Sequence, residues 1–385
     1  MNDTQKLDVI VLGATGFTGK LVCEYLAKTY GTDADIRWGI AGRNGDKLNA
    51  LAAELGLGDL PRLIVDVEDK ASLDAMAEAC KVVLNTAGPY AKYGSNVVES
   101  CVRLGTDHVD LNGEPLWMYE VLNEYEDAAK KSGARIVFSC GFDSIPTDLG
   151  VQFLQEHAVS RFGRPLTRVK GRVKRIEGSA SGGSVASFSA TMETIQATPE
   201  LFAVMTNAFC LTPGFEGPEQ PPGNKKIFEE DLNSWSGPFI MATINSKNLH
   251  RSNLLLGHPY GTDLVYDEML LLGENPDDES NDKAFEMDMS LKPGDGPSRE
   301  EQQAGSYEIW YIGSNSEGDS LTVVVTGDQD PGYGSTSKMV AEAAVCLSQK
   351  PKGEEGGILT PASAMGAELR ERVQANAGLT FTLSE

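Results

Sequence analysis

Long apolar runs and clustered metal ligands are missing from this sequence of 385 residues. No apolar run approaches the roughly 18 to 20 residues that a membrane-spanning helix needs, and no apolar stretch follows a basic start as it does in a signal peptide. Four histidines and six cysteines never cluster at the spacing of zinc ligands. We therefore expect a cytoplasmic protein with no transmembrane segment and no metal site.

Positive charge is scarce as well. The chain holds 33 Lys and Arg residues against 56 Asp and Glu residues, which gives a net charge of -23. Such an excess of negative charge repels a polyanion, so we expect no nucleic-acid partner. The cysteines show no paired CxxC spacing, and most lie in apolar contexts where a free thiol packs as a small hydrophobic side chain. Reduced, buried cysteines are typical of a reducing compartment.

Short apolar segments and helical segments alternate through the first 150 residues. Leu7–Leu12, with the sequence LDVIVL, is apolar at most positions, as expected of a parallel strand covered by helices on both faces. Such an alternation indicates an α/β unit with a Rossmann-type, doubly wound parallel sheet, which we expect to span residues 1–150. The remaining expected strands are Ile36–Ala41, Arg62–Val67, Val82–Asn85, His108–Leu111 and Arg135–Ser139.

A glycine-rich turn follows the first strand. Gly13, Gly16 and Gly19 are spaced as in a dinucleotide-binding turn, with a strand before them and a helix after them. In such a turn the first glycine permits the tight bend, the second lets the backbone approach a pyrophosphate, and the third allows close helix packing. The N–H groups at the start of the helix then bind the phosphates. The alternative is a glycine-rich turn with a structural role alone.

The end of the second strand distinguishes between the two nicotinamide cofactors. NAD sites usually place Asp or Glu there, bonded to the ribose hydroxyls. This chain has Arg43 instead, with no acidic residue immediately before it. A guanidinium suits the 2'-phosphate of NADP through charge-assisted hydrogen bonds. The sequence therefore predicts an NADP(H) site, the alternative being that Arg43 is a solvated turn residue.

Further polar residues follow the later strands, at the sheet edge where open α/β folds bind ligands. Asp66 is placed to approach the adenine side of the cofactor, and the turn Asn85–Tyr90 to approach the nicotinamide side. Phe142 and Asp143 follow the sixth strand and are candidates for the substrate end. The alternative for Asp143 is that it caps the helix expected over Ile145–His157.

The second half changes to a mostly antiparallel pattern, which predicts an α+β substrate or dimerisation domain over residues 151–330. Arg168–Ile176 alternates basic and apolar residues, as in a strand buried on one face. Its basic side chains either receive a phosphorylated carrier arm or form a solvated face. They are Arg168, Lys170, Arg172 and Lys174. The other expected strands include Phe239–Ser246, Leu264–Leu272 and an antiparallel pair, Tyr307–Ile312 and Ser320–Gly327.

Three later segments complete the organisation of the chain. Leu201–Phe215 is apolar, and we expect it to be a helix buried in the core or in a homodimer contact, or else a wall of a hydrophobic substrate pocket. Glu274–Arg299, rich in acidic residues, Pro and Gly, is expected to be an exposed excursion. Residues 331–385 contain an expected helix over Ser335–Leu347 and a last strand over Leu379–Leu383, and we expect them to return to the first domain.

Separated stretches of the chain together resemble the saccharopine dehydrogenase-like oxidoreductases, and within them the trans-acting enoyl reductases. The resemblance covers nearly the whole chain, so it is far more specific than the glycine turn alone. It rests on VIVLGATGFTGKLV at residues 9–22, IAGRN at 40–44, LNTAGPYAKYG at 84–94, DLNGE at 110–114, CGFDSIPTDLG at 140–150, PFIMA at 238–242, DPGYGSTSKM at 330–339 and GGILTPASAMG at 356–366.

This resemblance implies an NADP-binding Rossmann domain followed by an α+β domain, with the active site between them. It places the pyrophosphate against Gly13, Thr15, Gly16, Phe17 and Thr18, the 2'-phosphoribose against Arg43 and Asn44, and the nicotinamide side against Thr86, Ala87, Gly88, Pro89 and Tyr90. We find no arginine cluster for a substrate with several carboxylates, and the second half is rich in apolar and small residues. A hydrophobic unsaturated substrate is therefore favoured, such as an isoprenoid-like ketone or an acyl chain, whether free or linked to CoA or a carrier.

The expected reaction is hydride transfer from NADPH to an electrophilic carbon of an enoyl or enone group, with a nearby acid completing the reduction. Tyr90 and Tyr93 are the first candidates for this proton donor, and His108 and Asp143 follow. Two other functions stay open: an amino-acid or imine dehydrogenase, and an NADP-sensing or scaffold protein without chemistry. The first needs cationic groups at the substrate site, and the second tolerates a degraded turn at Asn85–Tyr90.

Overall fold

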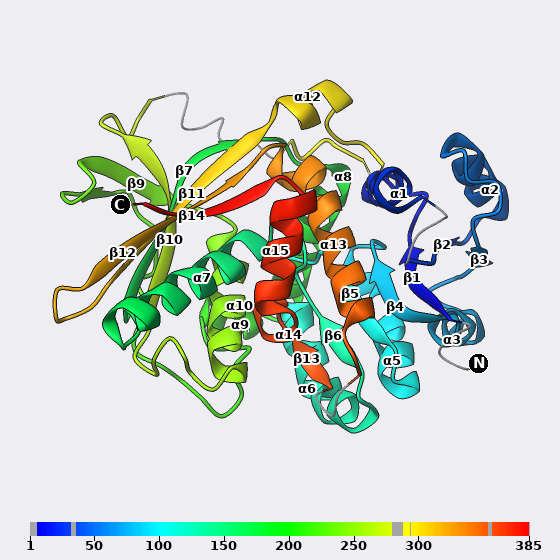
Figure 1. Cartoon of the computed structure of the whole chain (residues 1–385), viewed down its shortest axis with the longest axis horizontal. Helices are drawn as coiled ribbons and strands as arrows, with labels where there is room; N and C mark the ends of the chain where they lie inside the picture. The colour runs from blue at the N-terminus through cyan, green and yellow to red at the C-terminus, as the bar shows by residue number, and fades with distance from the viewer. Residues whose placement is uncertain (1–5, 32–35, 279–287, 293, 353–355, 385) are drawn as a thin grey trace.

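The computed structural model describes residues 6–31, 36–278, 288–292, 294–352 and 356–384. These residues form two sheets of seven strands each, with helices around them. Figure 1 shows the first sheet with its helices on one side of the molecule and the second sheet on the other. Helices α13 (Thr336–Gln349) and α15 (Gly366–Asn376) lie between them. The two sheets therefore share a middle layer that the C-terminal part of the chain supplies.

The first sheet is entirely parallel, in the order β13-β6-β5-β4-β1-β2-β3. Its strands are β1 (Leu7–Leu12), β2 (Trp38–Gly42), β3 (Arg62–Ile64), β4 (Cys80–Asn85), β5 (Asp107–Asp110), β6 (Arg135–Val137) and β13 (Gly357–Leu359). The helices that follow its strands are α1 (Phe17–Tyr30), α2 (Gly45–Glu54), α3 (Lys70–Ala79), α4 (Tyr90–Tyr93), α5 (Ser95–Leu104) and α6 (Pro115–Ser132). The middle strands are buried on both faces, which explains their nearly continuous apolar sequences. The expected Rossmann-type sheet is confirmed.

The second sheet is mixed and mostly antiparallel, in the order β14-β12-β11-β7-β10-β9-β8. Its strands are β7 (Arg168–Glu177), β8 (Ile227–Glu229), β9 (Ser234–Pro238), β10 (Val265–Gly273), β11 (Ser306–Ser314), β12 (Ser320–Gly327) and β14 (Leu379–Ser384). β7 and β10 run parallel, and the other neighbours run antiparallel. β11 alternates buried and half-buried residues, so one face of the sheet packs and the other is partly solvated. The expected α+β architecture is confirmed.

Helices α7 (Ile145–Phe162) and α10 (Ala242–Leu255) pack against this second sheet, and α10 replaces an expected strand. Other helical segments of this half are α8 (Gly182–Ala197), α9 (Leu201–Thr206), α12 (Arg299–Ala304), α14 (Pro361–Ala364) and the π-helical turn η2 (Pro331–Ser335). The strand expected over Phe239–Ser246 is wrong, because β9 ends at Pro238 and α10 begins at Ala242. α10 buries polar as well as apolar side chains around most of its circumference. Without a polar face, its sequence lacks the period by which a surface helix is recognised.

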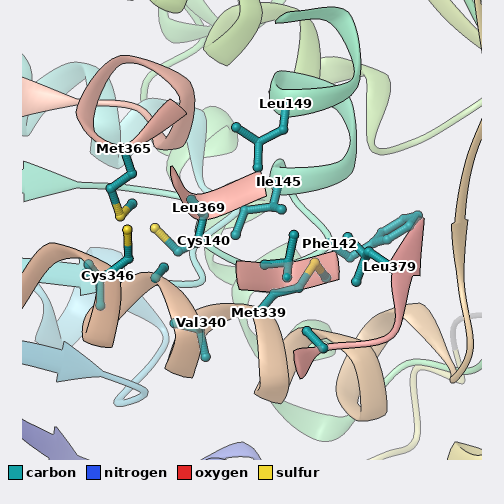
Figure 2. Packing of buried hydrophobic residues seen from close by; sticks show 14 of the residues in the cluster. Cys140, Phe142, Ile145, Leu149, Met339, Val340, Cys346, Met365, Leu369 and Leu379 are labelled. Atoms are coloured by element: carbon teal, nitrogen blue, oxygen red, sulfur yellow. The ribbon is translucent and has the colours of Figure 1, made fainter. Parts of the chain in front are cut away.

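One cluster of buried side chains joins the two sheets. Figure 2 shows Phe142 from the segment after β6, Leu149 from α7, Met339 from α13, Leu369 from α15 and Leu379 from β14 gathered in it. The C-terminal segment contributes β13 to the first sheet and β14 to the second. A close-packed core of this kind holds the two sheets in one relation and so fixes the geometry of the space between them.

The described residues include neither a helix suited to span a membrane nor a disulfide bond. No helix of the described residues is long and apolar enough to cross a membrane. All six cysteines are free, and all except Cys210 are buried. Within the same described ranges, no group of three or more His, Cys, Asp or Glu side chains is arranged to hold a metal ion.

Candidate functional site

Residues 13–19 form the glycine-rich turn between β1 and α1 together with the start of α1, and we call them the nucleotide turn. This turn packs tightly against the end of β4. Gly13 has a φ of +81°, and a Cβ at this position would lie 2.8 Å from Thr86 Oγ1. A Cβ at Gly19 would lie 2.2 Å from the carbonyl oxygen of Gly13. Glycine alone fits either position without a shift of the backbone. The local structure therefore has the tight bend and the close helix contact that the glycine spacing predicts.

The N-terminus of α1 is available to a ligand. Gly16 precedes the helix without any side-chain cap, and Phe17 and Thr18 in the first turn line a cavity. N–H groups in the first turn of a helix have no partner within it, and the helix dipole favours an anion there. This end of α1 therefore suits a pyrophosphate. Thr15 lies beside it, with its Oγ1 3.9 Å from the position that a Cβ at Gly42 would take.

Arg43, Asn44 and Asp66 follow the neighbouring strands β2 and β3. Arg43 is exposed and makes no hydrogen bond or ion pair with the residues that the structure describes, so its guanidinium can bind a 2'-phosphate. Asn44 caps α2, its Oδ1 accepting a hydrogen bond from the N–H of Lys47 at 3.0 Å. Asp66 Oδ1 accepts one from the N–H of Glu68 at 3.0 Å. Two of the three side chains thus use part of their hydrogen-bonding capacity locally.

The turn after β4 is held from both sides. The N–H and Oγ1 of Thr86 both donate to the last carbonyl of β1, at 2.9 and 2.8 Å. The carboxylate of Glu114 accepts hydrogen bonds from the N–H groups of Tyr90 at 2.9 Å and Ala91 at 2.8 Å. Ser187 of α8 donates to the same carboxylate at 2.6 Å. Glu114, which the sequence did not single out, therefore connects the expected nicotinamide side to a helix of the second half.

A cavity of about 360 Å³ opens between these turns and the second half of the chain. Its wall includes the N-terminus of α1, the turn after β4, the loop after β5, α8 and the start of α10. Polar residues that line it include Thr86, Asn112, Asp143, Ser184 and Tyr333. Among the described residues that line it, none is Lys, Arg or His. The cavity therefore adjoins the expected nicotinamide side, and the part of its lining that the structure describes offers no cation to a substrate carboxylate.

Much of the cavity lining that comes from the second half of the chain is apolar. Phe188 and Met192 contribute from α8, Met205 from α9 and Ile240 from the loop before α10. Phe188, Met192 and Ile240 expose between 38% and 49% of their surface, so the apolar lining continues to the rim. Exposed apolar surface at a cavity mouth is typical of a site that binds an apolar ligand.

The apolar segment Leu201–Phe215 has two parts. α9 buries none of its residues within the chain, and its Met205 lines the cavity. Phe209 and Leu211, which follow α9, are buried in the core. The interpretation of this segment as a pocket wall fits the first part, and the interpretation as core fits the second.

The tyrosines and the histidine proposed as proton donors lie in three different environments. Tyr90 lines the cavity, but its hydroxyl donates to the carbonyl of Asn85 at 3.0 Å, and burial raises its pKa well above the ordinary value. Tyr93 is 40% exposed and is not among the residues lining the cavity. His108 is buried on β5 against Phe138, where burial lowers its pKa to about 3. His108 is therefore a neutral core side chain at neutral pH.

Asp143 lines the cavity just before α7. Its carboxyl makes no hydrogen bond with the residues that the structure describes, and its buried Oδ1 lacks a partner. The N-cap residue of α7 is Ser144, so the alternative role of Asp143 as a cap is wrong. Burial and the negative charge of Glu268 raise the pKa of Asp143 to about 7. Near neutral pH this carboxyl can therefore hold a proton and give it to a substrate.

A hydroxyl pair that sequence reasoning missed faces the same cavity. Tyr333 Oη and Ser184 Oγ lie 2.7 Å apart, and whichever donates, one hydroxyl hydrogen is left for a further acceptor. Asp330 holds the turn in place, because its carboxylate accepts hydrogen bonds from the N–H groups of Tyr333 at 2.9 Å and Gly334 at 2.7 Å. The Tyr333 ring also contacts Phe17 of the nucleotide turn. The Asp-Pro-Gly-Tyr sequence marked a turn, but not its position in space.

The basic strand β7 is neither a phosphate-binding strip nor a bare solvated face. Each of its four expected basic side chains pairs with a carboxylate from β8, β10 or β11 or from the residues next to them. The pairs are Arg168 with Asp267, Lys170 with Glu229 at 3.0 Å and Asp231 at 2.8 Å, Arg172 with Glu229 at 2.5 Å and Asp267 at 2.8 Å, and Lys174 with Glu308 at 3.1 Å. The strand alone could not reveal this, since the acids come from elsewhere in the chain.

Known proteins share both the nucleotide turn and the rest of the chain. Residues 9–137 match the family described as the saccharopine dehydrogenase NADP binding domain. A Mycobacterium tuberculosis H37Rv protein named as a candidate trans-acting enoyl reductase is 33% identical, with 96% of each chain covered. The trans-acting enoyl reductase of Mycobacterium bovis BCG is 32% identical, again with 96% of each chain covered. The chain belongs to the saccharopine dehydrogenase-like family.

Membership of the saccharopine dehydrogenase-like family confirms the resemblance seen in the sequence motifs. The family's NADP-binding domain indicates NADP(H) as the cofactor and an oxidoreductase as the class of enzyme. The solved apo structure of saccharopine dehydrogenase (L-Glu forming) from Saccharomyces cerevisiae has a TM-score of 0.52 to this chain, at 14% identity. The match covers 98% of this chain and 99% of that one, and it establishes the shared fold alone.

Proposed function

We propose that this chain is an NADPH-dependent enoyl reductase that saturates the carbon–carbon double bond of an apolar acyl substrate. The observation that carries the proposal is the cavity. It begins at the nucleotide turn, continues along an apolar wall, and has the carboxyl of Asp143 on its lining. The names of the full-length relatives support the same chemistry.

The residues at the nucleotide turn fit NADP(H). Gly13 permits the tight turn against Thr86 that a Cβ would prevent, α1 presents an uncapped N-terminus, and Arg43 has no partner among the described residues. Thr15, Gly16, Phe17 and Thr18 would hold the pyrophosphate, Arg43 and Asn44 the 2'-phosphoribose, Asp66 the adenine side, and Thr86, Ala87, Gly88 and Pro89 the nicotinamide side. When bound, NADPH supplies the hydride that reduces the β-carbon of the enoyl group.

Side chains of the cavity would supply the other half of the reduction. Asp143 donates its proton to the α-carbon, so that the double bond gains one hydride and one proton. The ionised carboxyl then regains a proton from water that enters the cavity. The hydroxyl pair of Tyr333 and Ser184 donates a hydrogen bond to the carbonyl, where negative charge develops as the hydride arrives. Of the four side chains nominated from the sequence, Asp143 is thus the donor that we propose.

The apolar wall sets the substrate class within this proposal. An acyl chain would lie along Phe188, Met192 and Met205, with its carbonyl end near Asp143 and the nucleotide turn. Burying a chain here removes apolar surface from water on both partners, at about 25 cal/mol per Å². A CoA or carrier arm would leave through the open rim.

The two rival functions have less support. An amino-acid or imine dehydrogenase must bind a carboxylate, and no Lys, Arg or His is found among the described residues that line the cavity. A scaffold without chemistry has no use for Asp143, because its buried Oδ1 lacks a hydrogen-bond partner, and an unsatisfied buried oxygen lowers stability. A cavity carboxyl with a raised pKa is typical of a functional site.

The proposal is tested by following NADPH oxidation with short- and long-chain 2-enoyl pantetheine thioesters, their saturated counterparts, and imines of amino acids. We expect turnover of the enoyl thioesters alone. Asp143→Asn should lower kcat by about two orders of magnitude while leaving the Kd for NADPH unchanged. Tyr93→Phe, at an exposed tyrosine, is the matched control and should keep its activity. Reduction of imines but not enoyl groups would favour the rival dehydrogenase, and NADPH binding without any turnover would favour the scaffold.

A further inference from the structure

A buried polar cluster lies next to the segment that carries Asp143. Asn245 and Asn248, which are three residues apart on α10, both belong to it. Asn248 Nδ2 donates to Ser144 Oγ, next to Asp143, at 2.8 Å. Asn245 Nδ2 donates to Oε2 of Glu268 on β10 at 2.9 Å. α10 therefore connects the neighbour of Asp143 to a second carboxyl, which is buried.

The two carboxyls differ in their hydrogen bonds. Glu268 accepts one from Asn245 and another from Thr147 Oγ1, which lies 3.0 Å from its Oε1. The carboxyl of Asp143 accepts none from the part of the chain that the structure describes. Hydrogen-bond donors stabilise the ionised form of a carboxyl, and two neighbouring carboxyls inside a protein resist ionising together. The first negative charge of the pair therefore belongs on Glu268.

We propose that Glu268 is a positioning residue that carries the negative charge of this carboxyl pair and thereby keeps the proton on Asp143, which faces the cavity. The inference rests on the proposed function for its catalytic consequence, because it explains why Asp143 remains a proton donor at neutral pH. Loss of that proton to substrate would add a second negative charge to the cluster at the start of α7. The ionised pair then has a strong tendency to take a proton back.

Other charged and titratable groups around the pair favour the same assignment. Burial raises the pKa of Glu268 to about 7, and the hydrogen bonds to its carboxyl, together with the guanidinium of Arg172 on the neighbouring strand β7, oppose this rise by stabilising the ionised form. Tyr266 on β10 and Tyr311 on β11 also face Glu268, and burial raises the pKa of both well above the ordinary value, so they stay neutral. The hydroxyl of Tyr311 donates to Thr147 Oγ1 at 2.9 Å and so orients the Thr147 hydroxyl toward Glu268.

The test follows the Asp143 carboxyl directly by ¹³C NMR of protein labelled at the aspartate carboxyl carbons, with the signal assigned by its loss in Asp143→Asn. In Glu268→Gln the neighbouring charge is gone, and the titration midpoint of Asp143 should fall by about one pH unit or more. Glu268→Asp keeps a carboxylate and should restore most of the wild-type midpoint. Thr147→Val removes a donor from Glu268 without changing its shape, and should lower the midpoint of Asp143 by a smaller amount.

Kinetics provide the second readout. The alkaline limb of the kcat profile should move with the NMR midpoint in each variant, whereas the Kd for NADPH and the KM should not change. A midpoint of Asp143 that is the same in wild type, Glu268→Gln and Thr147→Val would overturn the inference. Because the NMR titration needs no substrate, the two failures are distinguishable. A shifted midpoint without enoyl turnover refutes the proposed function alone, and turnover with an unshifted midpoint refutes the role of Glu268 alone.

Discussion

Asp143→Asn is expected to stabilise the fold while it weakens catalysis, and the stabilisation should depend on pH. Burial and the charge of Glu268 raise the pKa of Asp143 from 3.8 to about 7. Between these two values the native protein binds more protons than the unfolded chain, so its stability falls as the pH rises. Asparagine has nearly the same shape and no charge, so it removes this dependence.

The size of the effect follows from the pKa difference. One pKa unit corresponds to about 1.4 kcal/mol. A carboxyl that titrates at 3.8 in the unfolded chain and at about 7 in the native protein loses ~2.5 kcal/mol of stability between pH 5 and pH 8. The free energy of unfolding gained by Asp143→Asn over wild type should therefore be larger at pH 8 by this amount. Any effect of the amide that does not depend on pH cancels in the comparison.

The assay is urea unfolding of both proteins at pH 5 and pH 8, with the linear extrapolation giving each free energy of unfolding. The m-value should be the same in all four experiments, which shows that the same two states are compared. A gain that is equal at the two pH values would mean that the Asp143 carboxyl ionises as easily in the native protein as in the unfolded chain. That result would remove the physical basis for its role as proton donor.

Three further outcomes are expected. Arg43→Ala should raise the Kd for NADPH about tenfold or more in a calorimetric titration and leave the Kd for NADH unchanged, because a charge-assisted bond to the 2'-phosphate is lost. An equal change for both cofactors would contradict the assignment of Arg43 to the 2'-phosphate. Met192→Lys places a charge on the apolar wall and should raise the KM for long-chain enoyl thioesters about tenfold but not for short ones, whereas the control Met192→Leu should leave both KM values unchanged. Equal effects on both chain lengths would argue against the apolar wall as the site of the acyl chain. Tyr333→Phe should lower kcat about a hundredfold with little change in the Kd for NADPH, and unchanged turnover would remove the hydroxyl pair from the mechanism.

The first sheet could be predicted from the sequence because its signals are local. Leu7–Leu12 is nearly all apolar since helices cover both faces of the strand, and Gly13 follows it because the turn needs a positive φ. The confirmed second sheet was visible in the alternation along β11 and β12. α10 was missed for the opposite reason: its polar residues Asn245 and Asn248 are buried, so burial and polarity no longer coincide.

The candidate site was predictable where one strand end determines it, and not where distant segments meet. Arg43 and the turn after β4 were nominated because they follow strands of one sheet, and their binding role stays a prediction. Glu268 and Tyr333 reach Asp143 and the nucleotide turn from β10 and η2, more than a hundred residues further along the chain. The basic strand was misjudged for the same reason, since Glu229 and Asp267 neutralise it from other strands. Pairings of this kind depend on the tertiary fold.

The most direct test of the proposed enoyl reductase activity uses NADPH that carries deuterium on the transferable position of the nicotinamide ring, together with a long-chain 2-enoyl pantetheine thioester. Mass spectrometry of the saturated product locates the label. We predict one deuterium at the β-carbon, and an α-carbon hydrogen that comes from solvent. A product without deuterium at the β-carbon, or no saturated product despite NADPH binding, would contradict the claim that this cavity reduces enoyl groups.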